Sequence, residues 1–535
     1  MSDDAEPGLS RRQLLAAGTT GLIATAAVPP VAGASRRRAG AADGTPEQVH
    51  LTWGDDPARS VVVSWASPGQ ALAPRVRIGQ RVIPAVERGP AAPRGGQVAW
   101  TYHALVDGLR PGATYGYAVT ADNDRNAADP FSATFRTAPE GRAAFRFTSF
   151  GDLAAANARR AGGFGQSADA VGPVEAFQPL FHLLNADLAD ADLSPAAQPQ
   201  AWRDFGNSVQ ASAANRPWMP VPGGHGAELA DQDQALASYL ARYTLPGNGA
   251  PGFEGRWYEF RVGTAAFICL SGDDVKRGYS AGAQTRWLEA TLAAARRDAS
   301  IDWVVVQLHQ CACSSAGAAE ADLGLRQRWL PVFDRYEVDL VVNGHDHDYE
   351  RSYPVRGFTP GLGTSTFGGG TVTQASGPVT LPSTAGQRVN TFTPSVVTTD
   401  ASGPFDTSKG TVYMVLGGGG TDKRDNVYGA KIANTTTFTQ IRTGAKPTAD
   451  STEPAAWSAM TDPADAYGVA HFQVDPGEPG ENTTITVTYY HAPTQTSGSP
   501  DYSVLETFQL TRPRRDRFFG RLGNHEKAAA GSVSR

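Results

Sequence analysis

Two stretches of the sequence with different hydrophobic patterns predict an all-β domain followed by an α/β domain. From about residue 45 to residue 139, short apolar runs are separated by Gly and Pro and show no helical period. From residue 144 to residue 512, short apolar runs alternate with amphipathic stretches of helical period, which is typical of α/β architecture. The chain has 535 residues, of which 41% are hydrophobic, and is therefore long enough to build both cores.

The charge balance and the cysteine content exclude several classes of protein. The chain carries 47 basic and 53 acidic residues, a formal net charge of −6, so it lacks the basic excess of a nucleic-acid binder. Its three cysteines cannot build a disulfide framework. We therefore expect a fold held by its hydrophobic core, with metal as a further candidate, and no nucleic-acid partner.

Residues 1–34 are predicted to be an export signal of the twin-arginine type, followed by a linker over residues 35–44. Arg11 and Arg12 precede a Leu-Leu pair, and an apolar stretch then runs to Val28. Residues 32–34, Ala-Gly-Ala, supply a cleavage site. The apolar run has about 15 residues, fewer than the ~20 that span a bilayer. An ordinary secretory signal and an uncleaved anchor are the alternatives.

This signal predicts the location of the protein and one of its partners. We expect the twin-arginine export machinery to carry the chain to a periplasmic, cell-surface or extracellular location. No second segment is long enough to be transmembrane, so we expect no stable membrane span once the signal is removed.

The first domain, residues 45–139, is predicted to consist of β-strands. Val49, Leu51 and Trp53 alternate with polar residues, and residues 61–65 and 131–135 have strand-like composition. Residues 109–117, Leu-Arg-Pro-Gly-Ala-Thr-Tyr-Gly-Tyr, resemble the corner of a fibronectin type III sandwich, where a Tyr hydroxyl closes a turn. Such domains are usually packing or spacer modules, and this one has no site signature.

The second domain, residues 144–512, is predicted to contain much parallel sheet with helices between the strands. Residues 284–298 and 325–336 have the helical period. We expect strands at 145–149, 181–184, 218–221, 265–270, 303–308 and 340–342, with late strands at 485–490 and 503–510. In such sheets ligands bind beyond the carboxyl ends of the strands, so the residues after each run are the candidates for a site.

Asp and His residues follow most of these strands. In chain order the candidates are Asp152, Asp187, Asp190, His225, His309, His345 and His347. One Asp is usually a helix cap and one His a satisfied polar group, but five such clusters indicate convergence. Carboxylates with imidazoles suit Fe, Mn or Zn, whereas Ca prefers sites made of oxygen alone. His345 and His347 are two residues apart, so in an extended segment both rings would face one side.

These motifs resemble those of the calcineurin-type metallophosphoesterases, and the two-domain layout resembles that of the purple acid phosphatases. The matching stretches are residues 149–152, 185–192, 223–226, 306–309 and 344–351, the last reading Gly-His-Asp-His-Asp-Tyr-Glu-Arg. The resemblance covers nearly the whole chain after the signal. It implies a fibronectin III-like sandwich followed by a four-layer αββα metallophosphoesterase domain.

The resemblance also implies a role for each candidate residue. Asp152 and His347 would ligate a first metal ion, and Asp187 would bridge the pair. His309 and His345 would ligate the second ion. The implied activity is acid-phosphatase-type hydrolysis of a small phosphate monoester, in which one of the two ions polarises a phosphoryl oxygen and a metal-bound hydroxide attacks in line. His225 would protonate the leaving alcohol.

Two positions depart from the family pattern. Asp190 stands where the family has a tyrosinate that ligates iron, so Asp190 either ligates through oxygen or is a solvated loop acid, and we expect no purple colour. Gly224 replaces an Asn that ligates the second ion, and Glu228 or Asn343 could substitute for it. A degenerate protein that binds metal or phosphate with little turnover is therefore one alternative function. A phosphodiesterase is the other.

The C-terminal tail, residues 513–535, is predicted to be basic and solvated. Arg512, Arg514, Arg515, Arg517 and Arg521 lie in or next to it. Residues 523–526 spell Gly-Asn-His-Glu, the missing family motif, but they follow no apolar run, so we expect a chance match.

Overall fold

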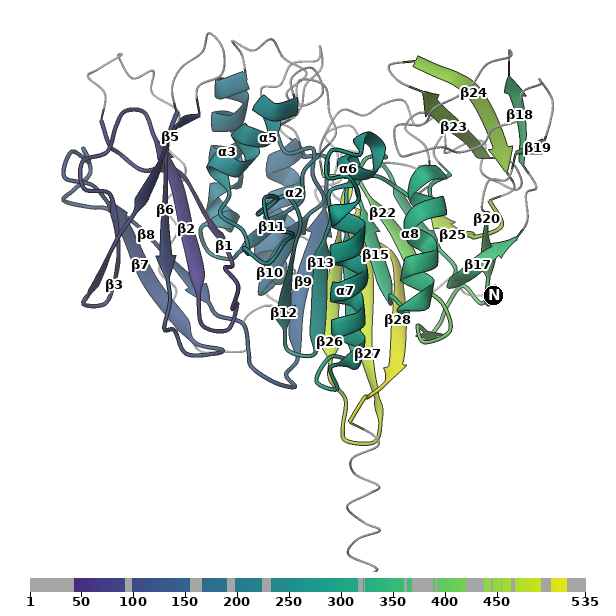
Figure 1. Ribbon diagram of the computed structural model, residues 1–535. Coiled ribbons are helices and arrows are strands. Elements are labelled where there is room, and N and C mark those ends of the chain that lie inside the picture. The colour runs from purple at the N-terminus through teal and green to yellow at the C-terminus, as the bar shows by residue number, and fades with distance from the viewer. Residues whose placement is uncertain are drawn as a thin grey trace, which may run out of the picture.

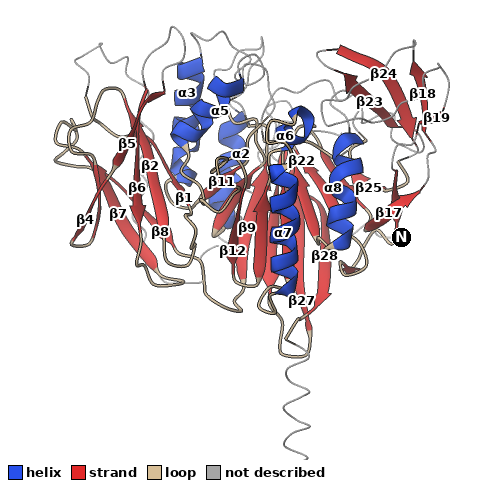
Figure 2. Cartoon of the chain, in the orientation of Figure 1, coloured by secondary structure: helices blue, strands red, loops and turns tan. Residues whose placement is uncertain are grey.

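Figure 1 shows a computed structural model of the chain, with a β-sandwich beside a larger α/β part. The structure describes residues 43–91, 99–153, 166–189, 198–223, 232–315, 321, 323–359, 363–367, 388–389, 393–419, 437–443, 446–453, 455–462, 467–491 and 502–516. Figure 2 separates the strand-only first part from the second part, where helices flank the sheets. The order of all-β and α/β parts that the sequence predicts is therefore confirmed.

The N-terminal part is a sandwich of two antiparallel sheets, with strand orders β1-β2-β6-β5 and β4-β3-β7-β8. Its strands are β1 (Glu47–Thr52), β2 (Val61–Ser67), β3 (Arg75–Ile78), β4 (Arg81–Pro84), β5 (Val86–Ala91), β6 (Ala99–Val106), β7 (Thr114–Thr120) and β8 (Phe131–Arg136). The Tyr115 hydroxyl accepts a hydrogen bond of 2.8 Å from the backbone N–H of Arg110. This bond closes the turn before β7, as predicted.

The α/β part has two large mixed sheets, each with seven strands among the described residues. The β9 sheet has the order β11-β10-β9-β26-β27-β28-β21, from β9 (Phe145–Phe150), β10 (Phe181–Leu184), β11 (Trp218–Pro220), β21 (Phe405–Asp406), β26 (Gly468–Asp475), β27 (Asn482–His491) and β28 (Ser503–Pro513). The β14 sheet has the order β12-β13-β14-β15-β22-β16-β25, from β12 (Tyr258–Val262), β13 (Ala265–Cys269), β14 (Trp303–Gln307), β15 (Leu340–Asn343), β16 (Tyr349–Ser352), β22 (Val412–Leu416) and β25 (Ser458–Thr461).

Parallel pairing is confined to part of each sheet. Strands β9, β10 and β11 are parallel, as are β13, β14, β15 and β22. A small sheet pairs β17 (Val355–Thr359) with β20 (Thr393–Val396). A four-stranded sheet has the order β19-β18-β24-β23, from β18 (Gly363–Phe367), β19 (Arg388–Val389), β23 (Thr437–Thr443) and β24 (Lys446–Glu453). The parallel strands that the sequence predicts are those whose carboxyl ends carry Asp152, Asp187, His309 and His345.

Helices cover the outer face of each large sheet, which gives the predicted four layers (Figure 1). On the β14 sheet, α7 (Ala283–Arg297) and α8 (Leu323–Arg335) share a buried apolar cluster with β13 and β14. On the β9 sheet lies α2 (Gln166–Phe177), whose Phe177 ring packs 4.9 Å from that of His471 in β26. The other described helices are α3 (Gln198–Ala213), α5 (Gln232–Arg242) and α6 (Gly272–Arg277). The helical period of the sequence predicts α7 and α8 but not α2, α3, α5 or α6.

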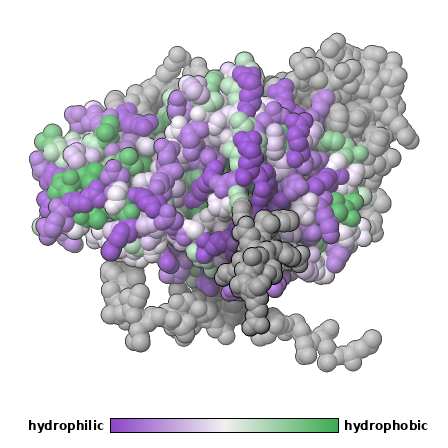
Figure 3. All heavy atoms as spheres, turned by 60° about the horizontal axis from the view of Figure 1, so that its bottom comes forward, coloured by the Kyte–Doolittle hydropathy of each residue, from purple (hydrophilic) through white to green (hydrophobic). Residues whose placement is uncertain are grey.

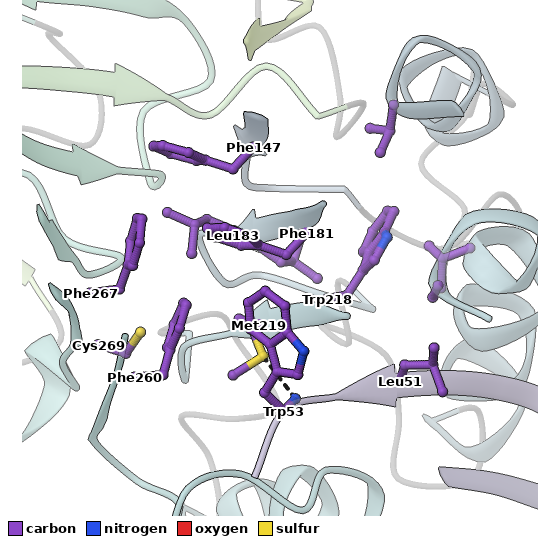
Figure 4. Packing of buried hydrophobic residues seen from close by; sticks show 14 of the residues in the cluster. Leu51, Trp53, Phe147, Phe181, Leu183, Trp218, Met219, Phe260, Phe267 and Cys269 are labelled. Carbon is purple, nitrogen blue, oxygen red and sulfur yellow. Dashed lines mark hydrogen bonds between the residues drawn. The ribbon is translucent and has the colours of Figure 1, made fainter. Parts of the chain in front are cut away.

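A core of aromatic rings fills the space between the two large sheets. The ring of Phe147 in β9 stacks on that of Phe472 at 4.4 Å and meets Phe267 of the β14 sheet edge-on at 5.2 Å. Figure 4 shows Trp53 of the sandwich reaching this core beside Phe181 and Phe260. Because β1 contributes to the same core, the sandwich and the α/β part are joined by hydrophobic burial.

Hydrogen bonds at the end of α5 reinforce this joint. Nε2 of His50 lies 3.0 Å from the carbonyl oxygen of Arg242, and Nε2 of His103 lies 2.9 Å from that of Ala241. Burial lowers the pKa of His103 to about 3, so the imidazole is neutral and donates from Nε2. These bonds satisfy carbonyl groups in the last turn of the helix.

No helix in the described part of the chain is long and apolar enough to cross a membrane.

The prediction of a solvated C-terminal tail is wrong for Arg512 and Arg514, which are both buried. Arg514 pairs with Asp516 at 2.6 Å, whereas Arg512 reaches from β28 to the other large sheet. The tail from residue 517 onward, including residues 523–526, lies outside the described residues.

A buried carboxylate, Asp339, ties the two large sheets together. Its Oδ1 accepts a hydrogen bond of 2.7 Å from Arg512, and its Oδ2 accepts one of 2.6 Å from Arg296 and one of 2.7 Å from the backbone of Val304. Burial favours the neutral acid, but the two arginines outweigh this effect and hold the pKa of Asp339 below its usual value.

We predict that Arg512→Met lowers the free energy of unfolding by about 3–5 kcal/mol, because it leaves a buried carboxylate without one of its two cations. Urea denaturation measures the change. The control is Arg81→Met, which breaks a surface pair with Asp107 and should cost no more than ~1 kcal/mol. Equal losses in the two variants would contradict the role of Arg512.

Candidate metal centre

The carboxyl ends of the parallel strands of both sheets meet at one place. The β9 sheet delivers Asp152 and Asp187, and the β14 sheet delivers His309 and the segment 344–348. The backbone N–H of Gly151 donates to the carbonyl of Leu416 at 2.7 Å, which joins the two sheets beside the site. The structure therefore brings together residues that are up to about 195 positions apart in sequence.

The backbone at this place is strained. Asp152, Ala186, Asp187 and His345 have φ values of 60°, 71°, 45° and 72°, in the left-handed region that residues with a Cβ rarely adopt. Such conformations cost free energy and persist where the surrounding structure imposes them, often at functional sites. The segment with His345 and His347 is bent, so it lacks the extended conformation in which both rings would face one side.

Three of the predicted ligands form a compact donor cluster. Nε2 of His309 lies 3.0 Å from Oδ2 of Asp187 and 3.2 Å from Nδ1 of His345, and donor atoms of the three residues all lie within 4.8 Å of one another. Zinc bonds to nitrogen and oxygen of about 2.0–2.1 Å place the donors of a tetrahedral ion about 3.3 Å apart. The spacing and the chemistry of this donor set therefore fit one metal ion.

A second pair of predicted ligands lies beside this cluster. Nε2 of His347 is 3.6 Å from Oδ1 of Asp152, and Oδ2 of Asp152 accepts a hydrogen bond of 2.9 Å from the backbone N–H of His345. Burial raises the pKa of Asp152, although His347 and His309 oppose the shift. The shared backbone contact couples the position of Asp152 to that of His345.

The orientation of His309 is fixed by the backbone. Its Nδ1 lies 2.9 Å from the carbonyl oxygen of Asn185, which can only accept, so Nδ1 carries the proton and Nε2 faces the donor cluster. Burial lowers the pKa of His309, but Asp187 and Asp152 outweigh burial and raise it to about 10. The carboxylates thus make this corner of the protein favourable for positive charge.

Asn185 is a supporting residue to which sequence analysis assigned no role. Its side-chain amide donates to Ser149 at 3.0 Å and to the backbone of Asn343 at 3.2 Å, and its Oδ1 accepts from Gln307 at 3.1 Å. Asn185 thereby links the ends of β9, β10, β14 and β15. The only feature of the sequence that could have indicated this supporting role is the place of Asn185 at a strand end, two positions before Asp187.

Two glycines allow the strand ends to come this close. A Cβ on Gly344 would lie 2.5 Å from the carbonyl oxygen of Asn185 and 2.6 Å from Oδ2 of Asp152. A Cβ on Gly223 would lie 2.3 Å from Oδ1 of Asp187. Side chains at these positions would displace the candidate ligands, so both glycines belong to the site.

Further carboxylates are buried behind the candidate ligands. Asp346, Asp348 and Glu350 are each nearly inaccessible to solvent. Burial raises the pKa of Asp346 and Asp348, and it raises that of Glu350 to about 7. Burial therefore disfavours the charged forms of these acids, and a cation at the centre would favour their ionisation.

Not every predicted residue can be placed. Asp190, His225, Gly224 and Glu228 lie outside the described residues. Asn343 uses its side-chain nitrogen to donate to the carbonyls of Leu308 and Gln310, at 3.2 and 2.8 Å. Its Oδ1 is buried and has no hydrogen-bond partner among the described residues. Asn343 as a substitute ligand therefore stays a prediction.

Comparison with known proteins relates this chain to acid phosphatases. Residues 46–137 match the family model described as "Purple acid Phosphatase, N-terminal domain". An uncharacterized protein of Mycobacterium tuberculosis is 35% identical over 560 residues, covering 96% of this chain and 98% of its own. Fe(3+)-Zn(2+) purple acid phosphatase 12 of Arabidopsis thaliana is 24% identical, covering 58% of this chain and 65% of its own. The chain belongs to the purple acid phosphatase-like metallophosphoesterases.

A solved structure shows the same fold. Purple acid phosphatase PPD1 from yellow lupin (Lupinus luteus) superimposes with a TM-score of 0.59 at 16% identity, covering 89% of this chain and 76% of its own. This likeness confirms the order of sandwich and α/β part, whereas the predicted resemblance to the purple acid phosphatases is confirmed by the family model and the relatives named above.

We predict that Gly344→Ala weakens metal binding by at least about tenfold, because the added Cβ would displace Asp152 and the carbonyl that orients His309. Competition with a chelator measures the affinity. Gly116→Ala is the matched control, since a Cβ there meets no atom within 4 Å. If both variants bind metal with wild-type affinity, the close approach of Asn185 and Asp152 to Gly344 is not needed for metal binding.

Proposed function

We propose that this protein is an exported metal-dependent phosphoric ester hydrolase of the acid phosphatase type that cleaves small phosphate monoesters at a two-metal centre. The observation that carries the proposal is the donor cluster of Asp187, His309 and His345, with Asp152 and His347 beside it. Membership of a phosphatase-like family supports the reaction class.

The residues of the centre divide between two ions in this proposal. Asp152 and His347 would hold the first, His309 and His345 would hold the second, and Asp187 would serve both. A carboxylate close to both ions would reduce the repulsion between two nearby cations. Mixed carboxylate and imidazole ligands suit Fe, Mn or Zn. When bound, the ions would polarise a phosphoryl oxygen and activate water for in-line attack.

The chain's own groups supply the remaining steps. The Asn185 carbonyl holds His309 in the tautomer that directs Nε2 to the centre. His225 is proposed as the acid that protonates the leaving oxygen, and the negative charge of a bound phosphate ester would favour its protonated form. Gly223, two positions before His225, lies so close to Asp187 that a Cβ there would be 2.3 Å from Oδ1 of Asp187.

Hydrolysis of a simple aryl phosphate by the metal-loaded protein tests this function. We expect turnover that falls on the order of a thousandfold or more in Asp187→Ala and in His309→Ala, because each change removes a ligand of the centre. Asp107→Ala, at an exposed position of the sandwich, should retain wild-type turnover. Turnover that survives both ligand substitutions would refute the two-metal mechanism.

The replaced Asn ligand provides a second test. If Gly224 weakens the second ion's site, Gly224→Asn should increase turnover at limiting metal concentration, measured as the metal needed for half-maximal rate. Absence of turnover in both wild type and Gly224→Asn, with metal bound in each, would favour a phosphate-binding protein over an enzyme.

Export by the twin-arginine route rests on the sequence of residues 10–34. We expect Arg11→Lys combined with Arg12→Lys to leave the chain inside the cell, as measured by fractionation. Undiminished export of this double variant would favour an ordinary secretory signal.

A further inference from the structure

A cleft of about 740 Å³ lies between the sandwich and the α/β part, away from the metal centre. It is lined by β7 and β8 on one side, and on the other by the starts of β9 and β10, the end of α2 and the turn before β11. Figure 3 turns the lower side of Figure 1 toward the viewer: hydrophobic surface gathers over the sandwich at the left, while the middle of this face is mainly hydrophilic.

The charged groups that line the cleft are mostly basic. Arg136, Arg146 and Arg216 come from β8, β9 and the turn before β11, and Glu175 is the one acidic residue among the lining side chains that the structure describes. The formal charges of these four side chains sum to +2. Three separate elements therefore present guanidinium groups to one space.

Arg216 is held in the wall of this cleft by contacts with neighbouring residues. It is 93% buried, and one terminal nitrogen pairs with Glu175 at 3.1 Å while the other lies 3.3 Å from the carbonyl of Pro179. Its Nε is buried and has no hydrogen-bond partner among the residues that the structure describes. A buried guanidinium N–H without an acceptor is costly, and the positive charge of Arg216 in the wall of the cleft favours an anion there.

The walls of the cleft are fixed to each other. The backbone N–H of Thr134 in β8 donates to Oδ1 of Asn215 at 3.3 Å, and the Tyr117 hydroxyl in β7 donates to the carbonyl of Ala214 at 2.7 Å. Arg136 donates from Nε to the carbonyl of Gly112 at 3.2 Å. A site of this kind loses little conformational freedom when a ligand binds.

We propose that this cleft is a binding site for a small multivalent oxyanion of the phosphate class, such as inorganic phosphate or pyrophosphate. Guanidinium groups form paired, charge-assisted hydrogen bonds with oxyanions. Because the arginines belong to different elements, a tetrahedral group with oxygens in several directions matches them better than a planar carboxylate. The side-chain amides of Gln178 and Gln473 are further donors.

The site is separate from the metal centre. Strand β9 begins at the cleft and ends two residues before Asp152, and β10 begins there and ends three residues before Asp187. The six residues of β9, at about 3.3 Å each, place the two sites roughly 20 Å apart. An anion in the cleft therefore touches no candidate metal ligand, and its binding does not depend on the proposed hydrolase activity.

Titration calorimetry with pyrophosphate tests the proposal. The full chain is stripped of metal on a chelating resin, so that the metal centre does not retain the anion, and is titrated at physiological ionic strength. We expect one saturable site per chain. The double variant R136Q/R146Q should weaken binding at least about tenfold, because it removes two exposed cations and no core side chain.

The control is R77Q/R110Q, which removes the same charge from exposed positions of the sandwich outside the cleft and should change affinity by less than about twofold. Equal weakening in the two double variants, or no saturable binding of pyrophosphate at millimolar concentration, would overturn the site. Citrate, titrated in parallel, should bind more weakly, and citrate binding as tight as that of pyrophosphate would overturn the assignment to the phosphate class.

Discussion

The burial of several carboxylates at one edge of two sheets is the constraint on which the rest of the structure depends. Asp152 and Asp187 are almost inaccessible to solvent, and Asp346 and Asp348 lie buried behind them. Uncompensated buried charge is costly, so such a cluster is stable only with protons or cations nearby. His309, His345 and His347 lie among these acids and provide part of the compensation and the remaining donors of a metal centre.

The fold holds this centre by backbone geometry more than by flexible side chains. Strand ends from two sheets meet where four residues with side chains adopt left-handed conformations, and Gly344 permits a contact that any Cβ would block. The Asn185 carbonyl orients His309, and the Asn185 amide links neighbouring strands. Ion pairs far from the centre, such as Arg512 with Asp339, hold the two sheets together. The sandwich contributes Trp53 to the shared core and is therefore part of the same rigid frame.

Much of this arrangement could be predicted because its signals are local. Apolar runs mark the strands, and the Asp or His after each run marks a potential ligand, so Asp152, Asp187, His309, His345 and His347 were all identifiable. The supporting contacts were not, because they depend on pairing between distant segments: Arg512 and Asp339 are 173 positions apart. The bend at His345 was also missed, since a spacing of two residues does not encode a left-handed backbone. The roles expected for Asp190 and His225 stay predictions.

We propose that these strand-end residues form a centre for two metal ions. Elemental analysis of protein purified from its natural location, compared with Asp187→Asn, tests it most directly. We expect about two ions of Fe, Mn or Zn per wild-type chain, and a marked loss in the variant, because Asp187 is the residue proposed to serve both ions. Wild-type protein that binds no metal even after reconstitution with Fe, Mn and Zn would contradict the account.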